Sequence, residues 1–156
     1  MNGVIFLDFD GVMVTDRYQD QLTDAGSPLR DGYGAKFDPA CVELLKEIID
    51  ATDAGIVVTS TWKMDMGLDG LQQMWKERGL PGEVVGITPD IDPIHRGYEV
   101  QAWLDAHPTA VRYAIIDDCP LLDFFRENQQ EHLFKVHQST GLDESTTRKV
   151  IEHVNR

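Results

Sequence analysis

Residues 4–12 read Val-Ile-Phe-Leu-Asp-Phe-Asp-Gly-Val and combine an apolar strand with an acidic turn. The first four residues form a continuous apolar run, which is typical of a strand covered on both faces. Because alternate residues of an extended chain point to the same side, Asp8 and Asp10 share one side while Phe9 turns into the core. Gly11 permits a sharp turn directly after them. An acidic turn that only ends a strand is the alternative interpretation, since Asp-Gly is also a common turn pair.

Further apolar runs follow this strand and alternate with helical patterns. Strands that are apolar throughout and alternate with helices imply a parallel sheet covered on both faces, which is an α/β fold. Asp38-Pro39 marks the start of the first predicted helix, because aspartate is a good N-cap and proline fits the first helical turn. The expected strands are 4–7, 56–58, 84–87, 113–116 and 132–136. The expected helices contain the apolar positions within 41–49, 68–75, 100–104 and 147–154.

The size and charge of the chain limit what it can bind. Its 156 residues suit one domain, 1–156, and no linker or repeat divides them. The formal charge of −13 disfavours binding along a nucleic acid backbone. No apolar run reaches the ~20 residues of a membrane helix, and the start lacks the basic region of a signal peptide. We therefore expect a cytoplasmic protein without membrane contact, in which Cys41 and Cys119 are reduced and partly buried. The sequence gives no indication of the oligomeric state.

Polar side chains stand at the ends of three of the expected strands. These are Asp8, the hydroxyl cluster at 59–61, and the pair Asp117 and Asp118. In parallel sheets, ligands bind outside the carboxyl ends of the strands. Adjacent carboxylates near a core edge repel each other unless a cation or hydrogen-bond donors neutralise them. Carboxylate oxygens suit Mg²⁺, and the five histidines are dispersed, so softer metals are disfavoured.

The hydroxyl cluster supplies groups that bind phosphoryl oxygens. Ser60 offers a hydroxyl and a backbone N–H at a strand end. A phosphoryl group also needs a cation, and two residues are candidates. Arg96 stands before a predicted helix, and Lys63 follows Ser60 by three residues. A polar loop and a surface arginine are the alternative interpretations of these residues.

The order of these motifs along residues 4–118 resembles that of the haloacid dehalogenase (HAD) superfamily. The resemblance rests on an Asp-x-Asp-Gly motif after the first strand, a serine after the second, a basic residue, and a distant Asp-Asp pair. More narrowly, the stretches 59–63, 96–104, 115–118 and 141–142 resemble the branch named for Swiss-army-knife RNA repair proteins. The resemblance implies a three-layer α/β/α Rossmann-like fold with a five-stranded parallel sheet of order 3-2-1-4-5 and a minimal cap or none.

The resemblance also implies a reaction. Asp8 would be the nucleophile that forms an aspartyl-phosphate, and Asp10 would protonate the leaving oxygen and then activate water. Mg²⁺ would be held by Asp8, the backbone carbonyl of Asp10, and the pair Asp117 and Asp118. Which residue of that pair touches the metal directly is left open.

Four further residues would surround the phosphoryl group. Ser60 would bind its oxygens together with the backbone N–H of Thr61. Arg96 occupies the third-motif position, where most superfamily members have lysine; it can bind phosphate bidentately, and Lys63 stays an alternative. The expected substrate-binding residues are Gly11, Thr59, Thr61 and Lys63.

The short segment 13–36 is expected to be a mobile flap or a hairpin, from which Arg17, Tyr18 and Arg30 could touch substrate. A site that is almost uncapped suits a large substrate, such as a protein or a nucleic acid end in RNA or DNA repair, or needs a partner to close it. The expected substrate is a phosphomonoester, either a small molecule or the end of a macromolecule. Three rival interpretations stay open. They are a signalling receiver domain, a catalytically silent HAD-like binding module, and a phosphomutase or phosphonate hydrolase. A receiver lacks support because the third strand ends Gly86-Ile87-Thr88, without an acidic phosphoacceptor.

Overall fold

The computed structural model describes residues 3–92, 94–109, 112–120 and 124–156. In chain order the elements are β1 (Val4–Leu7), α1 (Asp16–Asp24), α2 (Pro39–Thr52), β2 (Gly55–Val58), α3 (Trp62–Glu77), β3 (Val84–Ile87), α4 (Arg96–Ala106), β4 (Tyr113–Asp117), a 3₁₀ helix (Glu127–His132), β5 (Leu133–Lys135) and α5 (Glu144–Val154). None of the helices in these ranges is both long enough and apolar enough to cross a membrane.

The strands form one parallel sheet in the order β3-β2-β1-β4-β5, which confirms the predicted order 3-2-1-4-5. β1 lies at the centre, between β2 and β4. From β1 the chain builds outward to β2 and β3, then returns to add β4 and β5 on the other side. Strand order therefore reverses at β1, and the crevice at such a point is where ligands bind in sheets of this type.

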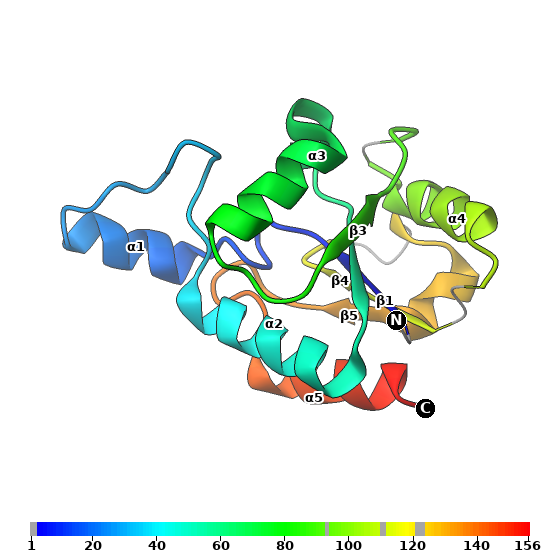
Figure 1. Ribbon diagram of the computed structural model, residues 1–156. Coiled ribbons are helices and arrows are strands. Elements are labelled where there is room, and N and C mark those ends of the chain that lie inside the picture. Colours follow the sequence, from blue (N-terminus) through cyan, green and yellow to red (C-terminus); the bar gives the residue numbers. More distant parts are fainter. Residues whose placement is uncertain (1–2, 93, 110–111, 121–123) are drawn as a thin grey trace.

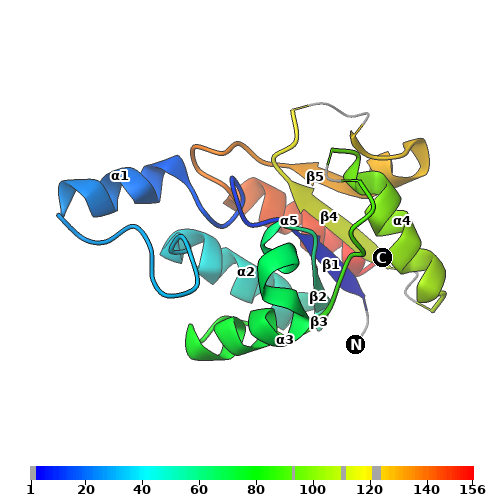
Figure 2. The ribbon, with the colours of Figure 1, turned by 90° about the horizontal axis from the view of Figure 1, so that it is seen from above.

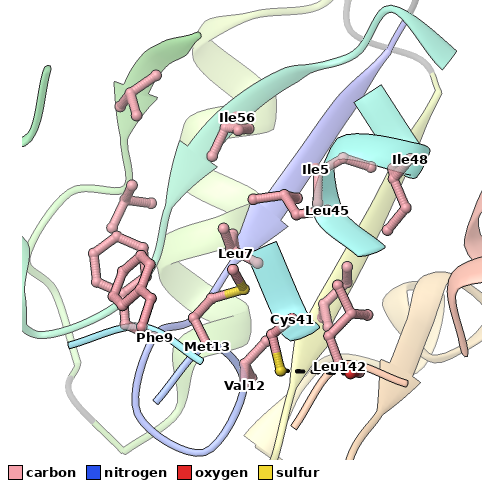
Figure 3. Close-up of a cluster of buried hydrophobic side chains, with 14 of the residues drawn as sticks. Ile5, Leu7, Phe9, Val12, Met13, Cys41, Leu45, Ile48, Ile56 and Leu142 are labelled. Carbon is pink, nitrogen blue, oxygen red and sulfur yellow. Dashed lines mark hydrogen bonds between the residues drawn. The ribbon is translucent and has the colours of Figure 1, made fainter. Parts of the chain in front are cut away.

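Helices cover both faces of the sheet, which makes three layers (Figures 1 and 2). On one face, Ile5 and Leu7 of β1 pack with side chains of α2, α3 and α5, among them Leu45, Leu71 and Val150. Figure 3 shows the part of this cluster around Leu7 and Leu45. On the other face, the alternate β1 residues Val4 and Phe6 pack with Val100 and Trp103 of α4. A strand buried on both faces has no polar alternation, which is why β1 is apolar throughout.

Side-chain caps mark the starts of α2 and α5, and the first of them confirms the start predicted at Asp38-Pro39. Asp38 precedes α2 and accepts a hydrogen bond from the backbone N–H of Ala40, and Pro39 occupies the first turn. Asp143 caps α5 by accepting from the N–H of Thr146. These caps satisfy N–H groups that have no partner within the helix.

The segment 13–36, for which the sequence predicted a mobile flap or a hairpin, contains a helix that the prediction did not include. It begins with helix α1, which is capped by the Thr15 hydroxyl and buries only Leu22 among its residues. Both ribbon views place α1 at the edge of the molecule, away from the sheet (Figures 1 and 2). A short antiparallel bridge between Arg30 and Ala35 then turns the chain back. The helix is polar on most positions, so its sequence lacks the apolar periodicity that signals a packed helix. We call residues 27–36 the flap.

Candidate active site

Strand register brings the polar residues at the strand ends together. Leu7 is paired with Val58 on one side and with Ile116 on the other. The residues that follow these positions lie side by side at the carboxyl edge of the sheet, and they are Asp8, Thr59 and Asp117. The ladder continues one step into this edge, because the N–H of Asp8 donates to the Ile116 carbonyl at 3.2 Å.

Three carboxylates converge at this edge. Asp8, Asp117 and Asp118 each place one oxygen within 4.8 Å of the others. Asp8 and Asp117 are buried, and Asp118 is partly exposed. Gly11 makes room for this cluster: its φ is +80°, and an added Cβ would lie 1.9 Å from Asp118 Oδ2. The turn after β1 therefore requires glycine both for its backbone conformation and for the approach of Asp118.

Arg96 bridges two of these carboxylates. As the first residue of α4, it places Nη1 2.7 Å from Asp8 Oδ2 and 2.8 Å from Asp117 Oδ2. Asp117 is held from its other oxygen, Oδ1, which accepts a hydrogen bond from the N–H of Cys119. The guanidinium is therefore fixed beside the residue that sequence analysis names as nucleophile.

The charges of the cluster do not balance within the protein. Burial, and next the negative charge of Asp117, raise the pKa of Asp8 well above its ordinary value, although Arg96 opposes both effects. Burial also raises the pKa of Asp117. Burial acts to lower the pKa of Arg96, but the two carboxylates outweigh it and raise that pKa. One guanidinium facing three carboxylates leaves an excess of negative charge. Oxygen donors with this excess fit a hard divalent cation such as Mg²⁺.

Asp10 lies apart from that cluster, although the sequence predicted that it would share one side with Asp8, because the chain turns directly after β1 and the alternation of an extended strand ends there. Its side chain is exposed, and Oδ2 accepts a hydrogen bond from Trp62 Nε1 at 3.2 Å. It opens into a cavity of about 240 Å³ between the flap and the start of α3. The other residues that line this cavity are Arg30, Tyr33, Gly34, Ala35, Thr61, Trp62, Asp65 and Met66.

The hydroxyl cluster occupies the turn between β2 and α3. Ser60 is buried, and its Oγ accepts from the backbone N–H of Trp62 at 3.3 Å. Thr59 is also buried, and within the described residues its hydroxyl has no hydrogen-bond partner. Thr61 is exposed, precedes the first turn of α3 and lines the cavity beside Asp10. The N-terminus of a helix attracts anions, so this turn offers both hydroxyls and the positive end of α3.

Lys63, the second candidate cation, points into the interior. Its side chain is only 4% exposed, and Nζ lies 2.6 Å from Glu99 Oε1 and 2.8 Å from Thr88 Oγ1. Its charge is thus compensated by a carboxylate of α4. Arg96, in contrast, contacts the acidic cluster. Of the two candidate cations, Arg96 is therefore the one that lies beside Asp8.

The three residues of segment 13–36 that the sequence named as possible substrate contacts separate in the structure. Arg17 forms an ion pair with Asp38 at 2.8 Å. Neither Arg17 nor Tyr18 is among the described residues that line the cavity, whereas Arg30 is. Sequence analysis did not single out Tyr33, which also lines it, or Glu99, the partner of Lys63. A lone tyrosine in a polar loop and a glutamate on a helix carry no pattern that would have identified them.

Comparison with known proteins identifies the family. A scan against protein-family models matches residues 4–147 to the HAD domain in Swiss Army Knife RNA repair proteins. A search of curated proteins and a search of solved structures each gave no match. The matched region contains every strand of the sheet and every site residue described above. This chain therefore belongs to the HAD domain family of Swiss Army Knife RNA repair proteins.

Proposed function

We propose that the protein is a Mg²⁺-dependent phosphatase that hydrolyses a phosphomonoester through an aspartyl-phosphate on Asp8. The observation that carries this proposal is the different placement of the two aspartates that follow β1. Asp8 is buried against a guanidinium at the point where strand order reverses, while Asp10 stands free of the cluster at the mouth of a cavity. A nucleophile and a separate proton donor need this arrangement.

In the first step, a carboxylate oxygen of Asp8 attacks phosphorus and the bond to the leaving oxygen breaks. Asp10 gives its proton to that oxygen, so the leaving group departs as an alcohol. In the second step, Asp10 takes a proton from water as the water oxygen attacks phosphorus. The bond between phosphorus and Asp8 then breaks, which restores the Asp8 carboxylate and releases inorganic phosphate.

The surrounding residues hold the transferring group. Arg96 would neutralise phosphoryl oxygens next to Asp8, and Ser60 with the N–H of Thr61 would bind them from the β2 end. Asp8, Asp117, Asp118 and the Asp10 carbonyl would hold Mg²⁺. When bound, Mg²⁺ offsets the carboxylate charge and lets a phosphate dianion approach an anionic nucleophile.

A phosphorylated nucleic acid end is the second candidate substrate. The family description, which refers to RNA repair, and the open cavity beside Asp10 support it. The chain carries 27 acidic against 14 basic residues, so contact along a nucleic acid backbone is unfavourable and recognition would be confined to the terminus. A catalytically silent binding module is less consistent with the presence of Asp10. Only the backbone carbonyl of this residue would hold the metal, so its carboxylate has a use in proton transfer but none in metal binding.

Hydrolysis of p-nitrophenyl phosphate tests the proposal. We expect turnover with Mg²⁺ and none after chelation with EDTA. Asp8→Asn should abolish turnover, and Asp10→Asn should lower it by about 10²- to 10⁴-fold, the usual contribution of general acid–base catalysis. Asp69→Asn, which changes an exposed aspartate of α3, is the matched control and should leave the rate unchanged. Turnover that survives Asp8→Asn, or no turnover in wild type, would contradict the proposal.

A further inference from the structure

The indole ring of Trp62 lies against the side chain of Asp10. Trp62 Nε1 donates to Asp10 Oδ2 at 3.2 Å, and within the described residues no other group hydrogen bonds to that carboxylate. An exposed aspartate without a partner samples several rotamers. The indole N–H is therefore the group that selects one orientation of Asp10.

Trp62 is itself held on several sides by the turn after β1 and by the flap. Phe9 meets the indole edge to face, with ring centroids 5.2 Å apart, and Phe37 lies 5.9 Å from it. The backbone of Gly34 passes so close that an added Cβ would lie 3.0 Å from the indole. The position of the indole N–H is thus fixed by packing.

Arg78, at the end of α3, holds the flap against the Trp62 ring through hydrogen bonds. It donates to both carboxylate oxygens of Asp31, at 2.9 and 2.8 Å, and to the carbonyls of Gly34 and Ala35, at 3.3 and 3.2 Å. Its guanidinium also lies 5.9 Å from the Trp62 ring centroid. The hydrogen bond between Tyr33 and Glu77 is a second link between flap and helix. These contacts turn the flap into a fixed support of the indole.

Asp10 and Trp62 line the same cavity, and this places them beside the leaving group. In the proposed mechanism Asp10 must reach the leaving oxygen, so the group attached to that oxygen lies in the space next to Asp10. Proton transfer requires the donor within about 2.6–3.2 Å of the acceptor, and small misplacements are costly.

We propose that Trp62 is a positioning residue that aims Asp10 at the leaving oxygen through its indole N–H, with the flap and Arg78 as its support. This inference rests on the proposed phosphatase function. It predicts that removing the N–H harms the reaction in proportion to how much the leaving group needs a proton. A tryptophan that only fills space would affect all leaving groups alike.

The test compares two substrates with Trp62→Phe, which keeps an aromatic ring and removes the N–H. p-Nitrophenyl phosphate releases a stable anion, whereas benzyl phosphate releases an alkoxide that leaves only with a proton. We measure kcat/KM, which reports the steps through transfer to Asp8. We expect kcat/KM to fall by about 10²-fold for benzyl phosphate and by less than about fivefold for p-nitrophenyl phosphate. Equal losses for both substrates, or no loss, would overturn the positioning role.

Trp75→Phe is the matched control. Trp75 also packs on Phe9, at 6.0 Å, but its Nε1 donates to the Pro81 carbonyl at 2.8 Å. Any effect of this substitution on kcat/KM should be the same for the two substrates. A selective loss of benzyl phosphate turnover in Trp75→Phe would show that disturbed packing is enough, and would overturn the inference.

A readout independent of turnover separates this inference from the proposed function. In a ¹H–¹⁵N spectrum, Asp10→Ala should move the indole N–H signal of Trp62 and leave those of Trp75 and Trp103 in place. Trp62→Phe assigns the Trp62 signal by its disappearance. An unmoved signal would show that the hydrogen bond is absent and overturn the positioning role itself. A moved signal in a protein without phosphatase activity would instead refute the proposed function, and the catalytic role of the contact with it.

Discussion

At Gly11 the chain passes so close to Asp118 that a side chain has no room there. Gly11→Ala combines left-handed backbone strain, which costs about 1–2 kcal/mol for a non-glycine residue, with a clash against the Asp118 carboxylate. We expect at least a tenfold loss in Mg²⁺ affinity, measured by isothermal titration calorimetry, because Asp118 must move away from Asp8 and Asp117. Phosphatase activity should fall with it.

Gly26 provides the matched control for this substitution. Its φ is +66°, and an added Cβ there would meet nothing within 4 Å. Gly26→Ala should therefore carry a similar backbone strain, visible as a small loss of thermal stability, with unchanged Mg²⁺ affinity. Equal affinities in the two variants would show that Asp118 takes no part in binding the metal.

Three members of the acidic cluster were predictable from the sequence, but the position of Asp10 outside it and the choice of cation were not. Asp8, Asp117 and Asp118 follow apolar strands directly, and parallel strands end at a common edge, so their meeting follows from the pattern. Arg96 and Lys63 are both close to helix starts, and the sequence left the choice between them open. That choice depends on the direction in which each side chain points from its helix. For Lys63, the answer is set by Glu99, which lies 36 residues away in the chain.

Helices α3 and α4 are joined by the buried ion pair of Lys63 and Glu99. Glu99 also accepts, through Oε2, from the N–H groups of Ile91 and Asp92, so it fixes the connection that leads into α4 and Arg96. Lys63→Met leaves an uncompensated buried carboxylate, and breaking such a pair costs about 3–5 kcal/mol. Urea unfolding should report this loss.

Two further variants check that explanation. Adding Glu99→Gln to Lys63→Met removes the buried charge and keeps an oxygen for the two N–H groups, so part of the stability should return. Lys46→Met breaks the exposed pair with Asp50 and should leave the unfolding midpoint nearly unchanged. A Lys63→Met protein as stable as Lys46→Met would refute the structural role of this pair.

Among the α-helices, α1 is the one that sequence analysis did not anticipate. The strands are apolar runs because helices cover both faces of the sheet, and the helices α2 to α5 show apolar periodicity because each buries one face against it. α1 buries Leu22 alone, so its sequence has no repeating apolar positions that would indicate a packed helix. Thr15, its N-cap, is the one local signal that the helix starts there, and a single threonine is too common to predict a helix. The flap has no periodic pattern either, because its support comes from Arg78, far along the chain.

At the scale of the whole molecule, a pair of histidines links the C-terminal helix α5 to the 3₁₀ helix that precedes β5. His132 Nδ1 and His153 Nε2 lie 2.8 Å apart, and His132 stacks on Tyr113 with ring centroids 4.0 Å apart. Burial first, and then the charges of His132 and Arg156, lower the pKa of His153, while Glu131 acts to raise it. Its folded-state pKa thus lies below the unfolded value, which is 6.5.

The sign of the pH dependence follows from this difference. Below about pH 6.5 the unfolded chain binds the proton at position 153 more readily than the folded protein does. The free energy of unfolding should therefore fall as the pH drops from 7.5 to 5.5. The fall should be smaller in His153→Gln, as measured by urea unfolding at the two pH values. An equal fall in both proteins would contradict this account of the α5 contact.

The architecture of the whole molecule was predictable in two different ways. Uniformly apolar strands such as Val4–Leu7, alternating with helices, are enough to predict a parallel sheet with covered faces. The order of the strands does not follow from those runs, because any strand could neighbour any other. It came from the resemblance of the motifs to the HAD superfamily, and the structure confirms it.

The central claim is that Asp8 carries the phosphoryl group during turnover, and trapping that intermediate tests it most directly. Acetyl phosphate has a good leaving group, so Asp10→Asn should still phosphorylate Asp8 but hydrolyse the product slowly. Borohydride reduces an aspartyl-phosphate to homoserine, which peptide mass spectrometry locates. We predict homoserine at position 8, dependent on substrate and Mg²⁺ and lost in Asp8→Asn. Homoserine at another aspartate, or phosphatase activity with no trapped residue at position 8, would contradict the mechanism.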